Sequence, residues 1–126
     1  MIPKITLETV SREDIERINL WLEDGEISDS WYGLDGDGNA VHIGYSPSHL
    51  MSDADLPTLE GIQNSSRRIF SLYSNDQGHI GEGQLVIEWA LQEAQLFILI
   101  GRKDLWHHHY GTSALISLLD EAFRNL

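Results

Sequence analysis

The residues best suited to bind a charged ligand lie near the end of the chain. Gly111-Thr112-Ser113 stands where an apolar strand and a loop lead into an amphipathic helix. At the start of such a helix, unpaired backbone N–H groups and the positive end of the helix dipole converge. The pattern therefore predicts an anion site in this segment.

Three consecutive histidines, His107 to His109, occupy the loop before that helix. They suggest a metal site, yet adjacent loop residues cannot all face one ion, and Asp104 is the only other ligand type at a suitable spacing. The alternative is a polar phosphate-binding loop. No metal is expected.

A second metal-like pattern is Asp35, Asp37 and Asn39, which resembles the opening of a calcium loop. It fails further along, because Ala40 stands where the loop needs glycine and Ser46 where it needs glutamate. The turn residues here instead predict a β-hairpin, with its glycines at positive φ.

These segments must be positioned by a small α+β fold. Residues 5–10 alternate like a half-buried strand, and Ser11 with Asp14 forms a capping box for a helix that ends near Gly25. The helix at the end of the chain presents an apolar face at i, i+3, i+4 and i+7 spacing. The expected elements are strand 5–10, helix 12–22, hairpin strands 31–34 and 40–45, an irregular stretch 46–60, a helical turn 59–65, strands 68–74, 80–89 and 94–100, and a helix after residue 111 with apolar positions 115, 118, 119, 122, 123 and 126.

Composition limits the functional classes. The 126 residues suffice for one core, so we expect a single domain over 1–126. Twenty acidic and eight basic residues give a net charge of −12, which disfavours nucleic acid as a ligand. Cysteine is absent, and no apolar run is long enough to span a membrane, so a soluble cytoplasmic protein is expected. The acidic stretch 11–60 is either a solvated surface or a lip that attracts a cationic amine.

A family resemblance appears in the segment Ile98-Leu99-Ile100-Gly101-Arg102-Lys103-Asp104-Leu105-Trp106, followed by Tyr110-Gly111-Thr112-Ser113-Ala114. It is similar to the cofactor segment of the GNAT superfamily of acyl-CoA N-acyltransferases, in its ribosomal-protein-acetyltransferase-like branch. Trp21-Leu22 and Gly78-His79-Ile80-Gly81 resemble other parts of that branch. The resemblance implies a mixed, mostly antiparallel sheet with flanking helices.

The resemblance also implies roles for these residues. Leu99 and Ile100 would pair with the pantetheine arm of acetyl-CoA, and the loop with the start of the helix would hold the pyrophosphate. Positive charge would come from Arg102 and Lys103. The implied cofactor-binding residues are Leu99, Ile100, Arg102, Lys103, Trp106, His107, His108, His109, Tyr110, Gly111, Thr112 and Ser113.

Direct acyl transfer to an amine needs a proton acceptor. The resemblance implies that Glu82, Glu88 or Glu93 is that base, because all three are near strands that line the acceptor side in this family. The alternative is that they are ordinary surface carboxylates of an acidic protein. Nucleophilic hydrolysis has no support, since the sequence holds no Ser/His/Asp grouping with an elbow motif.

Two departures from the family pattern concern the cofactor site. His109, and also His107, stand where the family uses glycine, whose backbone can approach a phosphate closely. The family fold also continues with a fifth strand that would begin beyond Leu126, so the resemblance implies that the chain corresponds to the N-terminal two-thirds of that domain. The strand 94–100 would then have a bare edge, which a symmetric homodimer could cover.

Two hypotheses follow. The first is an acyl-CoA-dependent N-acetyltransferase that acts on a primary amine, either a small molecule or a protein N-terminus. The alternative is a catalytically inactive GNAT-derived module that dimerises or senses a ligand.

Overall fold

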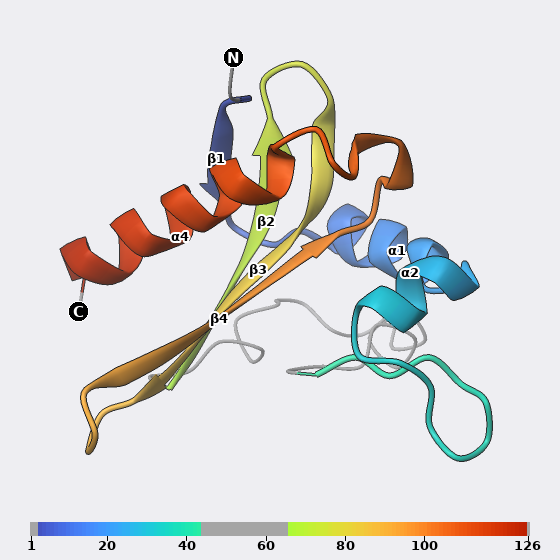
Figure 1. The fold of residues 1–126 in the computed structure, drawn as a ribbon, viewed down its shortest axis with the longest axis horizontal. Helices are drawn as coiled ribbons and strands as arrows, with labels where there is room; N and C mark the ends of the chain where they lie inside the picture. The colour runs from blue at the N-terminus through green and yellow to red at the C-terminus, as the bar shows by residue number, and fades with distance from the viewer. Residues whose placement is uncertain (1–2, 44–65, 126) are drawn as a thin grey trace.

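A four-stranded antiparallel sheet flanked by helices forms the part of the chain that the computed structural model describes, residues 3–43 and 66–125 (Figure 1). The α+β class predicted from the sequence is confirmed. The elements in chain order are β1 (Ile5–Glu8), α1 (Arg12–Trp21), α2 (Gly25–Ser30), β2 (Arg67–Ser74), β3 (Gly78–Glu88), β4 (Glu93–Ile100), the short 3₁₀ helix η2 (Lys103–Leu105) and α4 (Tyr110–Asn125).

The strands lie in the order β1-β2-β3-β4, and each pairs antiparallel with its neighbour. A turn that begins at Asn75 joins β2 to β3, and Gly78 takes a φ of +73°, as the turn residues there predicted. A register shift between Leu72 and Tyr73 interrupts the β2–β3 pairing. β4 pairs only with β3 within the described residues, so it is an edge strand there, whereas its apolar pattern predicted a central one.

Opposite faces of the sheet contact different helices. Leu72 and Ile80 pack with Tyr110 and Ala114 of α4 in one hydrophobic cluster. Ser71 on β2 points the other way and donates a hydrogen bond to Asp14 of α1. Because alternate residues of a strand face opposite sides, α1 and α4 cover different faces.

The first helix begins as its capping box predicted. The Ser11 hydroxyl accepts from the Asp14 N–H, while the Asp14 carboxylate accepts from the Ser11 N–H. Helix α2 was not predicted, because Gly25 was interpreted as a terminator of α1. Instead the Asp24 carboxylate accepts from the Glu26 N–H and caps a new helix.

Within the described residues, the predicted hairpin after α2 is reduced to a single bridge between Leu34 and Ala40, and residues 44 and 45 of its second strand lie outside them. Its turn is held by the Asp35 side chain, whose Oδ1 accepts from the N–H groups of Asp37 and Asn39. Gly38 has the predicted positive φ, at +82°, whereas Gly36 does not. The expected irregular stretch and helical turn between 46 and 65 lie outside the described residues.

The apolar face predicted for the last helix is only partly the buried one. Leu118 is buried, yet Leu115, Leu119 and Phe123 are exposed, and Phe123 is 86% accessible. Smaller residues approach the sheet instead, since Ala114 is fully buried and the Ser117 hydroxyl donates to the carbonyl of Ile5. Small side chains let the helix approach the sheet closely. The sequence prediction used only the large apolar positions and therefore missed this face of the helix.

Candidate functional site

The loop between β4 and α4 contains two residues with left-handed backbone. His107 has a φ of +68° and His109 a φ of +71°. Left-handed backbone costs a residue with a side chain about 1–2 kcal/mol. Both histidines identified as replacing glycine therefore hold a conformation that glycine adopts freely.

Backbone donors gather at the start of α4, as the sequence predicted. Helix α4 begins at Tyr110, and its first turn is closed by the Ser113 N–H, which donates to the carbonyl of His109 at 3.0 Å. Within the described residues, the N–H groups of Tyr110, Gly111 and Thr112 have no acceptor. The Ser113 hydroxyl is likewise buried without a partner there. These unsatisfied donors suit an anionic ligand.

The two basic residues before the loop are already engaged. Arg102 forms an ion pair with Asp104, at 2.7 Å between Nη2 and Oδ2, and the Lys103 ammonium lies 2.7 Å from a carboxylate oxygen of Asp24. Hydrogen bonding to Asp24 raises the pKa of Lys103. The positive charge expected beside a phosphate is thus balanced by carboxylates in this structure.

Two aromatic residues of the segment fix the loop against the sheet. The Trp106 indole N–H donates to the carbonyl of Ile100 at 2.9 Å, which folds the loop back onto the end of β4. Tyr110 is buried, and its hydroxyl donates to Asp76 in the β2–β3 turn. His107, His108 and His109 are exposed.

Only one of the three predicted base candidates is near the loop. Glu82 pairs with Leu99 across β3 and β4, next to Ile100. Glu88 faces Glu93 at the opposite end of the same hairpin. At about 3.3 Å per strand residue, that end lies roughly 20 Å from the loop.

Glu82 is fully buried within a network of polar side chains. Its Oε2 atom lies 2.8 Å from Nε2 of His42 and accepts from the Gln84 amide at 3.0 Å. Arg67 in turn donates to the Gln84 carbonyl oxygen. Neither His42 nor Gln84 was predicted from the sequence. The alternation of Glu82 and Gln84 along the apolar strand β3 could have indicated a buried polar pair.

Tyr32 borders this network on the same side of the sheet. Its hydroxyl is buried and has no hydrogen-bond partner among the described residues. Burial, followed by the negative charge of Glu82, raises the pKa of Tyr32 to about 12. Its ring also contacts Phe97 of β4, at 6.1 Å between centroids. Tyr32 therefore remains a protonated donor at neutral pH.

A cleft of about 720 Å³ opens beside this network, between the α1–α2 region and the loop 34–42. Its lining combines polar and apolar residues, and its charged residues are Glu23 and Asp35. His42 belongs to the lining, but its side chain is only 1% accessible, so the imidazole lies within the wall rather than in the open cleft. The complete lining is Asn19, Leu22, Glu23, Gly25, Ser28, Leu34, Asp35, Gly38, Asn39, Ala40, Val41 and His42.

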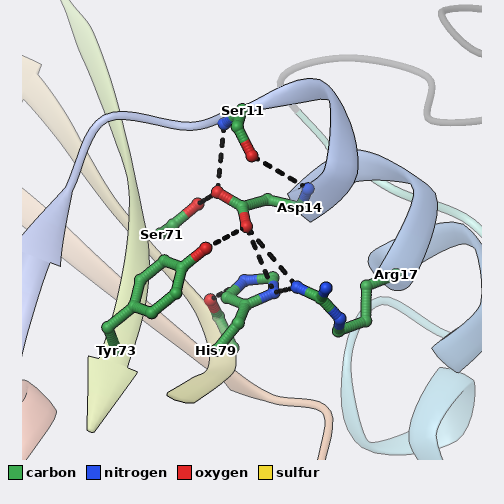
Figure 2. Close-up of polar contacts among 7 residues, drawn as sticks. Ser11, Asp14, Arg17, Ser71, Tyr73 and His79 are labelled. Atoms are coloured by element: carbon green, nitrogen blue, oxygen red, sulfur yellow. Dashed lines mark hydrogen bonds and ion pairs between the residues drawn. The ribbon is translucent and has the colours of Figure 1, made fainter. Parts of the chain in front are cut away.

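A second buried polar network joins α1 to the sheet (Figure 2). Both oxygens of Asp14 are used: Oδ2 accepts from Ser71 at 2.6 Å and Oδ1 from the Tyr73 hydroxyl. Burial alone would raise the pKa of Asp14, but the bonds from Ser71, Tyr73 and the Ser11 backbone outweigh burial and lower it. This carboxylate therefore anchors α1 as an ion.

No group of three or more His, Asp or Glu residues in ranges 3–43 and 66–125 is arranged to hold a metal ion. The described helices are all too short or too polar to cross a membrane. No known family model matches the chain, and a search of curated proteins found no significant match.

Proposed function

We propose that this domain is an acyl-CoA-dependent N-acetyltransferase of the GNAT kind, which transfers an acetyl group from acetyl-CoA to a primary amine. The observation that carries the proposal is the β4–loop–α4 unit. His107 and His109, which stand where that family has glycine, take positive φ, and N–H groups without an acceptor among the described residues gather at the start of α4.

The order of elements gives further support. A strand and two helices precede three antiparallel strands, and the loop and α4 follow the last of them. This is the arrangement expected for the N-terminal two-thirds of a GNAT fold. In that fold, Leu99 and Ile100 would lie along the pantetheine arm.

The donors at the start of α4 fit a pyrophosphate group. The N–H groups of Gly111 and Thr112 would hold its oxygens, and the buried Ser113 hydroxyl would gain the partner that it lacks among the described residues. Arg102 and Lys103 would contribute little while paired with Asp104 and Asp24. Acetyl-CoA, when bound, supplies the thioester whose acyl group is transferred.

In the proposed reaction the amine nitrogen attacks the thioester carbonyl, the C–N bond forms, and the C–S bond breaks to release the thiolate, which becomes the thiol when the proton lost by the amine is passed on to it. The amine must lose a proton in this process. Glu82 is the carboxylate nearest to the cofactor segment among the three candidates, and its Oε2 atom contacts both the Gln84 amide and His42. We assign Glu82 as the proton acceptor.

The assignment of Glu82 predicts a clear difference between two glutamates of one strand. Glu82→Gln keeps the size of the side chain but removes its basicity, so the rate of acetyl transfer should fall by about 10²-fold or more. Glu88→Gln is the matched control, because Glu88 lies at the far end of β3 and should leave the rate unchanged. The measurement is the release of free thiol from acetyl-CoA with a panel of primary amines; equal rates for both variants would refute the assignment.

An inactive GNAT-derived module is the alternative function. It is favoured by the neutralised Arg102 and Lys103 and by the full burial of Glu82. Such a module would bind acetyl-CoA or a related ligand without releasing thiol from it. The same assay, combined with a binding measurement, separates the two functions.

A further inference from the structure

His79 stands where α1, β2 and β3 meet, outside the groups assigned to acyl transfer. Its side chain is 2% accessible. The imidazole lies against Trp21 of α1 and Tyr73 of β2, with ring centroids 5.0 Å and 5.1 Å away. Figure 2 shows the ring beside Asp14 and Arg17 of α1.

The hydrogen bonds of His79 define its protonation state. Nη1 of Arg17 lies 2.8 Å from Nδ1, and a guanidinium can only donate, so Nδ1 must be an acceptor. Nε2 lies 2.9 Å from the carbonyl oxygen of Gly81 and must donate. His79 is therefore neutral, with its proton on Nε2.

An ion-pair partner for a protonated His79 is already close by. Oδ1 of Asp14 lies 3.6 Å from Nδ1 of His79 and 3.5 Å from Nη1 of Arg17. The charged or titratable groups that face the imidazole are Asp14 and Arg17 on α1, Tyr73 on β2 and Glu82 on β3. Arg17 has a side chain that is 43% accessible, so it can turn into water.

We infer that His79 is a proton-operated latch: when Nδ1 gains a proton, His79 exchanges Arg17 for Asp14 as its partner, and the guanidinium moves to solvent. The exchange follows because a protonated Nδ1 can no longer accept from Arg17 and becomes a second cation beside it. Charge balance around Asp14 is kept, since one cation replaces another.

The pKa of His79 determines the pH at which the latch operates. Burial lowers this pKa below the ordinary value of 6.5, Asp14 opposes that effect, and Arg17 adds to it. The exchange therefore takes place below pH 6.5. Protonation of His79 would also change the surroundings of Trp21, because the two rings are in contact. The Trp21 ring in turn occupies the space that a side chain at Gly101, just after β4, would need.

Imidazole nitrogen NMR and tryptophan fluorescence test the latch. At neutral pH, His79 should show the tautomer with its proton on Nε2. On acidification, a protonated imidazole against Trp21 should quench its fluorescence, with a midpoint below pH 6.5. Trp21→Phe should remove the fluorescence change while the NMR titration of His79 persists.

Arg17→Gln tests the effect of the Arg17 charge alone, because glutamine is neutral but can still donate a hydrogen bond to Nδ1 of His79. We expect the His79 midpoint to rise by about one pH unit in this variant. His108→Gln, in an exposed loop, is the control and should leave the midpoint unchanged. An unmoved midpoint in Arg17→Gln, or a proton on Nδ1 at neutral pH in the wild type, would overturn the latch; the second readout needs no variant to fold.

Discussion

At the scale of single residues, Asp14 combines a local and a tertiary role. Its carboxylate closes the capping box of α1 and also accepts hydrogen bonds from two β2 hydroxyl groups. The capping box was predictable, because it depends on a spacing of three residues. The partners on β2 were not, because Ser71 and Tyr73 are brought to Asp14 only by the pairing of distant segments.

The shifted pKa values of His79 and Asp14 predict loss of stability in acid. His79 has a folded pKa below 6.5, so the unfolded chain binds a proton more readily, and the free energy of unfolding should fall as pH drops below about 6.5. Asp14 has a folded pKa below 3.8, so its contribution is present above that value and lost as pH falls through the lowered pKa. Urea unfolding at a series of pH values measures both steps. His79→Gln should remove only the upper step, and an unchanged profile in this variant would contradict the account.

At the scale of elements, the β4–loop–α4 unit was the most predictable part of the site. The strand, the loop and the helix start all follow from an apolar run followed by Gly111-Thr112-Ser113. Three features were not predictable: helix α2, the pairing of Lys103 with Asp24, and the buried His42–Glu82 contact. The last two depend on contacts between residues far apart in sequence, which local patterns do not encode.

Replacing the strained loop histidines with glycine should stabilise the protein. His107→Gly and His109→Gly relieve positive φ, but glycine loses about 0.5–1 kcal/mol through its greater unfolded-state freedom. We expect a net gain of about 0.5 kcal/mol for each. His108→Gly is the control, because His108 does not have a positive φ, and it should destabilise slightly. Thermal unfolding gives the comparison, and a loss of stability in all three variants would argue against backbone strain.

At the scale of the whole molecule, an apolar surface runs from β4 onto α4 among the described residues. A groove of about 670 Å³ lies between the far end of the β3–β4 hairpin and the last turns of α4. Trp89 and Phe123 line it, and Ile116 is exposed nearby on the same helix. Contiguous exposed apolar residues beside a strand edge are typical of an interaction surface.

We propose that a second copy of the chain covers this surface. Light scattering after size exclusion should then report twice the monomer mass, and Phe123→Lys should give a monomer because it places a charge in the interface. Leu20→Lys is the matched control, since Leu20 is also exposed but lies on α1. A wild-type protein that remains monomeric at high concentration would refute the homodimer.

The proposed function requires acetyl-CoA to bind at the start of α4, and calorimetry of one pair of variants measures this binding. Gly111 has open space around it and no positive φ, so Gly111→Asp should fold normally, and an aspartate near a helix N-terminus is favourable to the helix. The new carboxylate would repel a pyrophosphate, whereas Gly36→Asp, at an equally open glycine in the loop 35–39, would not. We predict that the wild type and Gly36→Asp bind acetyl-CoA and that Gly111→Asp binds at least tenfold more weakly. Equal affinity in all three proteins, or no binding by the wild type at saturating acetyl-CoA, would contradict the account.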